Sequence, residues 1–180
     1  MDKIKLRALS LEDAKITYKW QNLDNIKKYY SGHPFPVSYE KEKQWIEKSI
    51  LSNTSNIVFG IERLDNCKLI GLSLLNNINL IHRVAEFAIF IGDINSVGKG
   101  YAKEATIKTV IFGFNKLGLN RIFLRVSIDN SPAINLYKKV GFISEGILRE
   151  CFYIDGKFID KEVMSMLKKE FEKIYKSPEL

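Results

Sequence analysis

Apolar and polar residues alternate in several stretches of the chain, as they do in strands that bury one face of a sheet. Ile4–Ala8 is the first such stretch, and Leu64-Asp65-Asn66 separates two later ones as the turn of a hairpin. Farther on, Asp155-Gly156 divides a long apolar-rich region into two strands. The expected strands span residues 4–8, 56–62, 68–75, 83–91 and 121–128, with two more between 142 and 167.

Cap residues and helical spacing predict about four helices between these strands. Ser10 and Asp13 have the spacing of a capping box, and Ser38 caps a second helix. A third helix follows a glycine-containing turn and ends near Gly118, and Asp129-Asn130-Ser131-Pro132 opens a short fourth one. The pattern therefore predicts an α/β (α+β) domain, with a mixed, largely antiparallel sheet of about seven strands flanked by about four helices.

Length and composition fit one domain, 1–180, with a core of residues 1–167 and a basic, lysine-rich tail of residues 168–180. A hydrophobic fraction of 46% can form a sizeable core. No apolar run reaches the roughly 18 residues of a membrane span, and the first residues lack the apolar region of a secretory signal. Cys67 and Cys151 form neither a disulfide framework nor a metal-type pair. We expect a cytoplasmic protein with no membrane contact and no bound metal.

The formal net charge is +7, from 28 Lys and Arg against 21 Asp and Glu. The basic residues are spread along the whole chain, and no basic run is interleaved with aromatic residues. We therefore expect no nucleic-acid partner. A basic surface would instead help to attract an anionic cofactor.

The first candidate for chemistry is a strand, a turn and a helix start between residues 85 and 102. The turn contains Gly98 and Gly100, and glycines let the backbone approach a ligand closely. The helix start adds unpaired N–H groups and the positive end of the helix dipole, which suits a pyrophosphate. Two glycines before a helix also occur in ordinary tight turns, so this alternative stays open. The spacing matches neither a P-loop nor the three-glycine dinucleotide fingerprint.

A second segment is more specific: Asn130-Ser131-Pro132-Ala133-Ile134-Asn135-Leu136-Tyr137-Lys138-Lys139-Val140-Gly141-Phe142. The two segments together resemble the acetyl-CoA site of the GNAT superfamily, in which a Gln/Arg-x-x-Gly-x-Gly/Ala turn precedes an Asn-x-x-Ala-x-x-Leu-Tyr-x-Lys-x-Gly-Phe motif. The resemblance extends from Ile4 to about Leu167. Val97 departs from it, because the family has Gln or Arg there. Backbone N–H groups bind most of the phosphate in this family, so the replacement should weaken the site rather than abolish it.

The resemblance implies an acyltransferase that moves acetyl from acetyl-CoA to a primary amine by direct attack on the thioester. It also implies that one β-strand pairs through its backbone with the pantetheine arm and polarises the thioester carbonyl. The glycine-containing turn would hold the pyrophosphate, while Asn130 or Asn135 would bond to the pantetheine. The cofactor-binding residues implied are Ile89, Phe90, Ile91, Val97, Gly98, Lys99, Gly100, Tyr101, Ala102, Lys103, Asn130, Ala133 and Asn135.

Two residues are candidates for catalysis. Tyr137 lies where the family places a tyrosine near the thioester sulfur, and its phenol could protonate the departing thiolate. The alternative is that Tyr137 only packs in the core. Glu86 is a carboxylate in the middle of an otherwise apolar strand and could take the proton of the acceptor ammonium. The alternative is a structural salt bridge with Arg83 or Arg125.

The sequence identifies the acceptor substrate less clearly than the acetyl donor. In this family the loop between the first two helices faces the thioester from the side opposite CoA, and here it offers Tyr29, Tyr30, His33 and Phe35. Aromatic rings attract an ammonium group but supply no spaced negative charges for a polycation. We expect a small-molecule amine or a peptide N-terminus, and a homo-oligomer is possible. Other segments resemble spermidine, ribosomal-protein and amino-sugar acetyltransferases, and a non-catalytic acetyl-CoA-binding module is the competing class. His82 is expected to be structural.

Overall fold

The computed structural model describes residues 2–28, 35–51 and 55–175. These residues form a seven-stranded sheet with the strand order β1-β2-β3-β4-β5-β7-β6. The strands are β1 (Ile4–Arg7), β2 (Ile57–Arg63), β3 (Leu69–Asn79), β4 (Val84–Ile91), β5 (Arg121–Ser127), β6 (Ile143–Ile154) and β7 (Lys157–Leu167). Only β4 and β5 run parallel, and every other neighbouring pair in the described sheet is antiparallel. The predicted fold class is confirmed.

The helices of the described residues are α1 (Ala14–Gln21), α2 (Asp24–Ile26), α3 (Tyr39–Leu51), α4 (Tyr101–Asn115), α5 (Ser131–Val140) and α6 (Lys168–Ile174). The longer ones, α1, α3, α4 and α5, are the expected four, and α2 and α6 are short additions. The Asp13 carboxylate accepts a hydrogen bond from the Ser10 backbone N–H at 2.8 Å. The Ser38 hydroxyl oxygen accepts one from the Lys41 backbone N–H at 3.2 Å. Both caps therefore use the residues that the sequence indicated.

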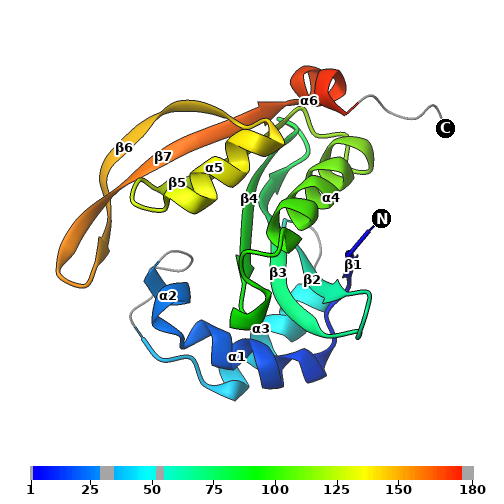
Figure 1. Cartoon of the computed structure of the whole chain (residues 1–180), viewed down its shortest axis with the longest axis vertical. Coiled ribbons are helices and arrows are strands. Elements are labelled where there is room, and N and C mark those ends of the chain that lie inside the picture. Colours follow the sequence, from blue (N-terminus) through cyan, green and yellow to red (C-terminus); the bar gives the residue numbers. More distant parts are fainter. Residues whose placement is uncertain (1, 29–34, 52–54, 176–180) are drawn as a thin grey trace.

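Helices cover the sheet on two faces (Figure 1). On one face, α1 and α3 pack Trp20 and Ile46 against apolar residues of β3 and β4. On the other face, α4, α5 and α6 bury the larger core, which includes Phe87, Phe114 and Met166. Gly92 permits the close approach of α1, because an added Cβ would lie 2.0 Å from the Trp20 ring. The β6–β7 hairpin extends beyond the helices and curves toward α2 (Figure 1).

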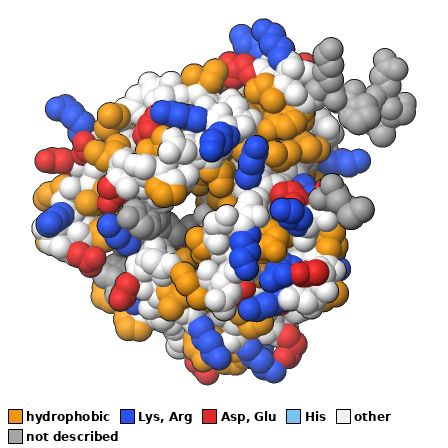
Figure 2. Space-filling model, viewed as in Figure 1, with side chains coloured by type: hydrophobic (Ala, Val, Ile, Leu, Met, Phe, Trp, Pro, Cys, Tyr) orange, Lys and Arg blue, Asp and Glu red, His pale blue; other side chains and the backbone are white. Residues whose placement is uncertain are grey.

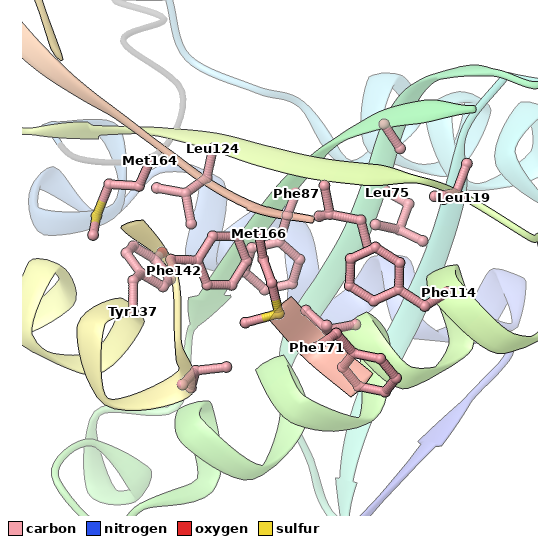
Figure 3. Packing of buried hydrophobic residues seen from close by; sticks show 14 of the residues in the cluster. Leu75, Phe87, Phe114, Leu119, Leu124, Tyr137, Phe142, Met164, Met166 and Phe171 are labelled. Atoms are coloured by element: carbon pink, nitrogen blue, oxygen red, sulfur yellow. The ribbon is translucent and has the colours of Figure 1, made fainter. Parts of the chain in front are cut away.

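Aromatic rings fill much of the larger core (Figure 3). Tyr137 meets Phe87 and Phe142 edge-on, with ring centroids 6.2 Å and 5.9 Å apart. The ring centroid of Phe114 lies 4.9 Å from that of Phe171, a residue of α6 that is only 2% exposed. A fully buried side chain of this size contributes roughly 1.5–3 kcal/mol relative to an exposed one. The segment predicted as a basic tail thus begins with a helix that closes the core.

Among the residues that the structure describes, no helix has both the length and the apolar character needed to span a bilayer.

Candidate active site

The two parallel strands at the centre of the sheet separate along their length. β4 and β5 pair only at Val84 with Arg121, Ala85 with Ile122 and Glu86 with Phe123. Beyond these positions β4 stays paired with β3, and β5 stays paired with β7. A cavity of about 870 Å³ lies in the split and is lined by both strands. The space-filling view is hollowed near its middle, beside the position of β4 in Figure 1 (Figure 2).

The cavity joins the two faces of the sheet. Successive side chains of a strand point to opposite faces, and both sets of β4 residues line the cavity. Phe87 and Ile89 point toward the core under α4 and α5, whereas Ala88 and Phe90 pack on the α1–α3 side. A ligand could therefore enter from each face and meet the other one in the split. The backbone edge of β4 that faces this split is unpaired with β5 beyond Glu86.

The turn before α4 supplies an anion-binding surface on one side of the cavity. Gly98 and Gly100 have φ angles of 77° and 86°, a region in which side chains with a Cβ are strained. No atom lies within 4 Å of the position that a Cβ would take at either glycine. This open space next to the N-terminus of α4 is where backbone N–H groups can reach a phosphate. Val97 also lines the cavity and is 52% exposed.

The turn is held in place by a buried carboxylate. Asp93 accepts a hydrogen bond from the Ser96 hydroxyl at 2.6 Å, and the Lys68 ammonium lies 3.1 Å from the same carboxylate. Burial of Asp93 opposes its ionisation, but the hydrogen bond from Ser96 and the charge of Lys68 together lower its pKa below the ordinary value. The turn is therefore anchored before any ligand binds.

Helix α5 borders the same side of the cavity. The Asn130 side-chain oxygen accepts a hydrogen bond from the Ala133 backbone N–H at 3.3 Å, so Asn130 caps the helix. Asn130 and Ala133 both line the cavity, and the cap uses the amide oxygen of Asn130 but not its amide nitrogen, which is a donor. The contact with the pantetheine that the resemblance implies for Asn130 stays a prediction.

Tyr137 projects from α5 toward Phe142 in the core (Figure 3), and it also lines the cavity. The residue is 8% exposed, and burial raises the pKa of its phenol well above the ordinary value of 10. The hydroxyl group therefore stays protonated at neutral pH and can act as a hydrogen-bond or proton donor.

Glu86 is held in an ion pair where the strands separate. Arg125 donates from Nε to one Glu86 carboxylate oxygen at 2.8 Å and from Nη2 to the other at 3.0 Å. Asn77 donates a third hydrogen bond at 3.3 Å. This is the salt bridge that the sequence offered as the alternative to a general base. The side chain still lines the cavity, so its catalytic role stays a prediction.

Most residues expected at the cofactor site lie around the cavity. The ones that line it are Ile89, Phe90, Ile91, Val97, Gly98, Gly100, Tyr101, Ala102, Lys103, Asn130 and Ala133. Lys99 and Asn135 are exposed and do not line it. Of the expected acceptor residues, Phe35 is 66% exposed and does not line the cavity, whereas Tyr29, Tyr30 and His33 fall outside the described residues. His82 is exposed in the turn before β4.

The sequence analysis missed Lys161 and Phe152, which line the cavity from β7 and β6. Lys161 shares its face of β7 with Ile159 and Val163, so it is a charge in an apolar row, like Glu86 in β4. The same reasoning that singled out Glu86 would have found Lys161. It was overlooked because the final hairpin shows no motif of its own.

Residues 3–143 match the family described as Acetyltransferase (GNAT) domain. The chain belongs to this family. A spermidine N(1)-acetyltransferase of Vibrio cholerae serotype O1 is 34% identical over 92% of this GNAT chain and 94% of its own length. A spermidine N(1)-acetyltransferase of Escherichia coli K12 is 32% identical over 97% of this chain and 91% of its own. The crystal structure of the Vibrio cholerae enzyme with CoA and spermine superposes with a TM-score of 0.87, covering 94% of this chain and 98% of that one at 33% identity.

This GNAT protein is an N-acetyltransferase, and acetyl-CoA is its acetyl donor. The cavity fits that donor in three respects: the open space at Gly98 and Gly100, the N-terminus of α4 and the unpaired edge of β4. The first suits a diphosphate, and the last suits an extended arm with amide groups.

Proposed function

We propose that this enzyme acetylates the primary amine of a small molecule, which enters the cavity from the α1–α3 face. The observation that carries the proposal is the split between β4 and β5. It brings the turn before α4 and Tyr137 to one side of the cavity and Glu86, Arg125 and Lys161 to the other. A donor and an acceptor can thus meet without sharing an entrance.

On the donor side, the thioester supplies an activated acetyl group, which passes to the amine as the CoA thiol is released. Residues 97–103 would bind the diphosphate through backbone N–H groups, and the free edge of β4 would hold the pantetheine arm. An N–H of β4 would also stabilise negative charge on the carbonyl oxygen. None of these roles needs the side chain at position 97, so Val97 is compatible with donor binding.

Tyr137 is assigned the role of general acid. It is a buried phenol that lines the cavity, and its raised pKa keeps the hydroxyl group protonated, so that it can donate a hydrogen bond to the sulfur of the leaving group. Negative charge develops on that sulfur only as the carbon–sulfur bond breaks. The contribution of Tyr137 should therefore appear in the chemical step rather than in donor binding.

Glu86 is assigned the role of proton acceptor for the amine, directly or through water. Support comes from its position in the cavity, opposite Tyr137 across the split. The competing role is structural, because three hydrogen bonds already engage its carboxylate. The two roles differ in the pH dependence of the rate that they produce, because only a proton acceptor at Glu86 would help a protonated amine to react.

A polyamine is the second candidate acceptor, because the relatives reported above are spermidine acetyltransferases. The charges around the acceptor side argue against it. Among the described residues that line this side of the cavity, Arg125 and Lys161 contribute two positive charges, against one negative charge on Glu86. A polycation would lose hydration without gaining counter-charges at this surface.

Release of the CoA thiol from acetyl-CoA, measured with a panel of amines, tests the proposal. The panel holds a monoamine, spermidine, an amino sugar and a peptide that begins with serine, each at the same concentration. We expect kcat/KM for spermidine to be no higher than for the monoamine. A value for spermidine a hundredfold above the others would establish the polyamine assignment, and no turnover with any amine would contradict the proposed function.

A further inference from the structure

We propose that the acceptor amine also carries an anionic group, a carboxylate or a phosphate, and that Lys161 binds it. This inference rests on the proposed function and names the class of acceptor for the same cavity. Lys161 lies on β7 and lines the cavity, and none of the motifs accounts for it.

Lys161 is buried in the wall of the cavity. The residue is 7% exposed, although it lies on β7 in the outer half of the sheet. Its ammonium nitrogen lies 3.3 Å from the centre of the Phe152 ring, so the ring face holds the charged end of the side chain. Both residues line the cavity. A buried ammonium at such a place needs a counter-charge or loses its proton.

No carboxylate among the described residues forms a direct ion pair with Lys161, although the negative charge of Glu86 acts on it from a distance. Glu86 is the carboxylate that lines the cavity with Lys161, and both of its oxygens are taken by the guanidinium of Arg125. Within the described ranges, Lys161 forms no ion pair with a carboxylate. Glu86, which lines the same cavity, pairs with Arg125 instead. Burial accordingly lowers the pKa of Lys161, because desolvation penalises the charged form. An anionic group on the substrate would complete the pair.

The positive charges of Lys161 and Arg125 also act on any second charged group that an acceptor carries. A second ammonium group would meet Lys161 and Arg125 and be repelled by both. An amine with a carboxylate or phosphate would place its anionic end on Lys161 and leave its amino group free to reach the split. Lys161 is therefore a specificity residue that favours amino acids or phosphorylated amines over diamines of equal length.

Matched acceptors isolate this effect. The pairs are norleucine with pentylamine, lysine with cadaverine, and O-phosphoethanolamine with ethanolamine, and the members of each pair differ only in the anionic group. For the wild-type enzyme we expect kcat/KM to be at least tenfold higher for the anionic member of one or more pairs. The first two pairs report on a carboxylate and the third on a phosphate.

Three variants assign the preference to Lys161. Lys161→Met should remove the preference, and Lys161→Arg should keep it. Lys157→Met is the matched control, because Lys157 is an exposed lysine at the start of the same strand. It should behave like the wild type. Melting temperatures show whether each variant is folded. If Lys161→Met does not fold, the preference of the wild-type enzyme for anionic acceptors and its retention in Lys161→Arg still test the inference.

The outcomes separate the two proposals. If the wild type acetylates amines without any preference for the anionic members, this inference is wrong and the proposed function stands. If Lys161→Met keeps the preference, another residue binds the anion and the inference is also wrong. If no amine in any pair is acetylated while acetyl-CoA still binds, the proposed function itself fails.

Discussion

Arg125 of β5 binds both carboxylate oxygens of Glu86, the last residue of β4 that pairs with β5, and Arg125 itself lies two residues beyond the last paired position of β5. The ion pair therefore spans the point where the sheet opens into the cavity. Side-chain exposures of 40% for Arg125 and 15% for Glu86 place it at the cavity wall rather than in the core. An ion pair at this point can hold the opening at a fixed width while one partner also faces the substrate.

The two roles of Glu86 can be distinguished by pH and stability together. If Glu86 accepts the proton of the amine, Glu86→Gln should shift the pH–rate profile to higher pH, because only amine that is already neutral can then react. Arg125→Gln should leave that profile in place. If the pair is structural, both variants and the double variant should lower the unfolding free energy by a similar amount, about 1 kcal/mol. Rate profiles and denaturant unfolding of the three variants measure both effects.

Tyr137→Phe should fold normally and turn over more slowly. The ring packs against Phe87 and Phe142, and phenylalanine keeps those contacts. Loss of a general acid typically costs about 10²–10⁴-fold, and here the loss should fall on kcat rather than on KM for acetyl-CoA. Steady-state kinetics at saturating acetyl-CoA measure it, with a melting curve as the folding control. An unchanged kcat would reduce Tyr137 to a packing residue.

Gly100→Val should weaken CoA binding more than it weakens the fold. The new side chain occupies the open space before α4 and also strains a backbone with φ of 86°. Gly118→Val is the matched control, because Gly118 has φ of 63° and open space as well but does not line the cavity. Both variants should lower the melting temperature, and calorimetry should show a loss of CoA affinity for Gly100→Val alone. Equal CoA affinity in the two variants would remove the turn from the donor site.

Glu145 makes the free energy of unfolding depend on pH in the acid range. Arg121 donates to its two carboxylate oxygens at 2.5 Å and 2.6 Å, and the Ser165 hydroxyl adds a bond at 2.7 Å. The hydrogen bonds from Arg121 are the main reason that the pKa of Glu145 falls from 4.5 to about 2. Because the folded-state pKa is lowered, the stabilisation is complete above pH 4.5 and is lost as the pH falls toward 2.

Urea unfolding between pH 7 and pH 2 tests this relationship. Glu145→Gln should reduce stability at neutral pH and flatten its decline below pH 4.5, since the titrating group is gone. Glu47→Gln, an exposed position on α3, is the control and should leave the curve unchanged. A variant at Glu145 with the wild-type pH dependence would contradict the assignment.

The sequence predicted the elements well where local chemistry decides them. The turn at Asp155-Gly156, the cap at Asn130 and the glycines before α4 all lie where expected, because each depends on a few adjacent residues. Helix α6 was not foreseen, because Phe171 and Ile174 stand among charged residues in the sequence, and the burial of Phe171 depends on tertiary contacts that include Phe114 and Tyr175. Likewise, β3 continues past the expected Leu75 to Asn79, since its polar end pairs with β4.

Sequence motifs identified candidate residues for the donor side of the site, but neither motifs nor periodicity identified the acceptor side. The residues expected at the donor site form contiguous motifs, and most of them line one cavity. The acceptor side is assembled from α2, β4, β5, β6 and β7, and no local pattern reveals which of their residues share a wall. The choice of Arg125 rather than Arg83 as the partner of Glu86 follows from the register of β4 and β5, which are distant in the sequence. Lys161 stands out in its apolar row, but its contact with Phe152 depends on the pairing of β6 with β7.

The separation of β4 from β5 divides the work of recognition between two kinds of atoms. On the donor side the contacts available are mostly main-chain groups, of the β4 edge and of the turn before α4. Such groups persist through most substitutions. On the acceptor side the available contacts are side chains, and a change in a single codon can substitute any one of them. The scaffold can therefore keep one co-substrate while its choice of partner drifts, and acceptor preference should be the property of this enzyme that is easiest to redirect.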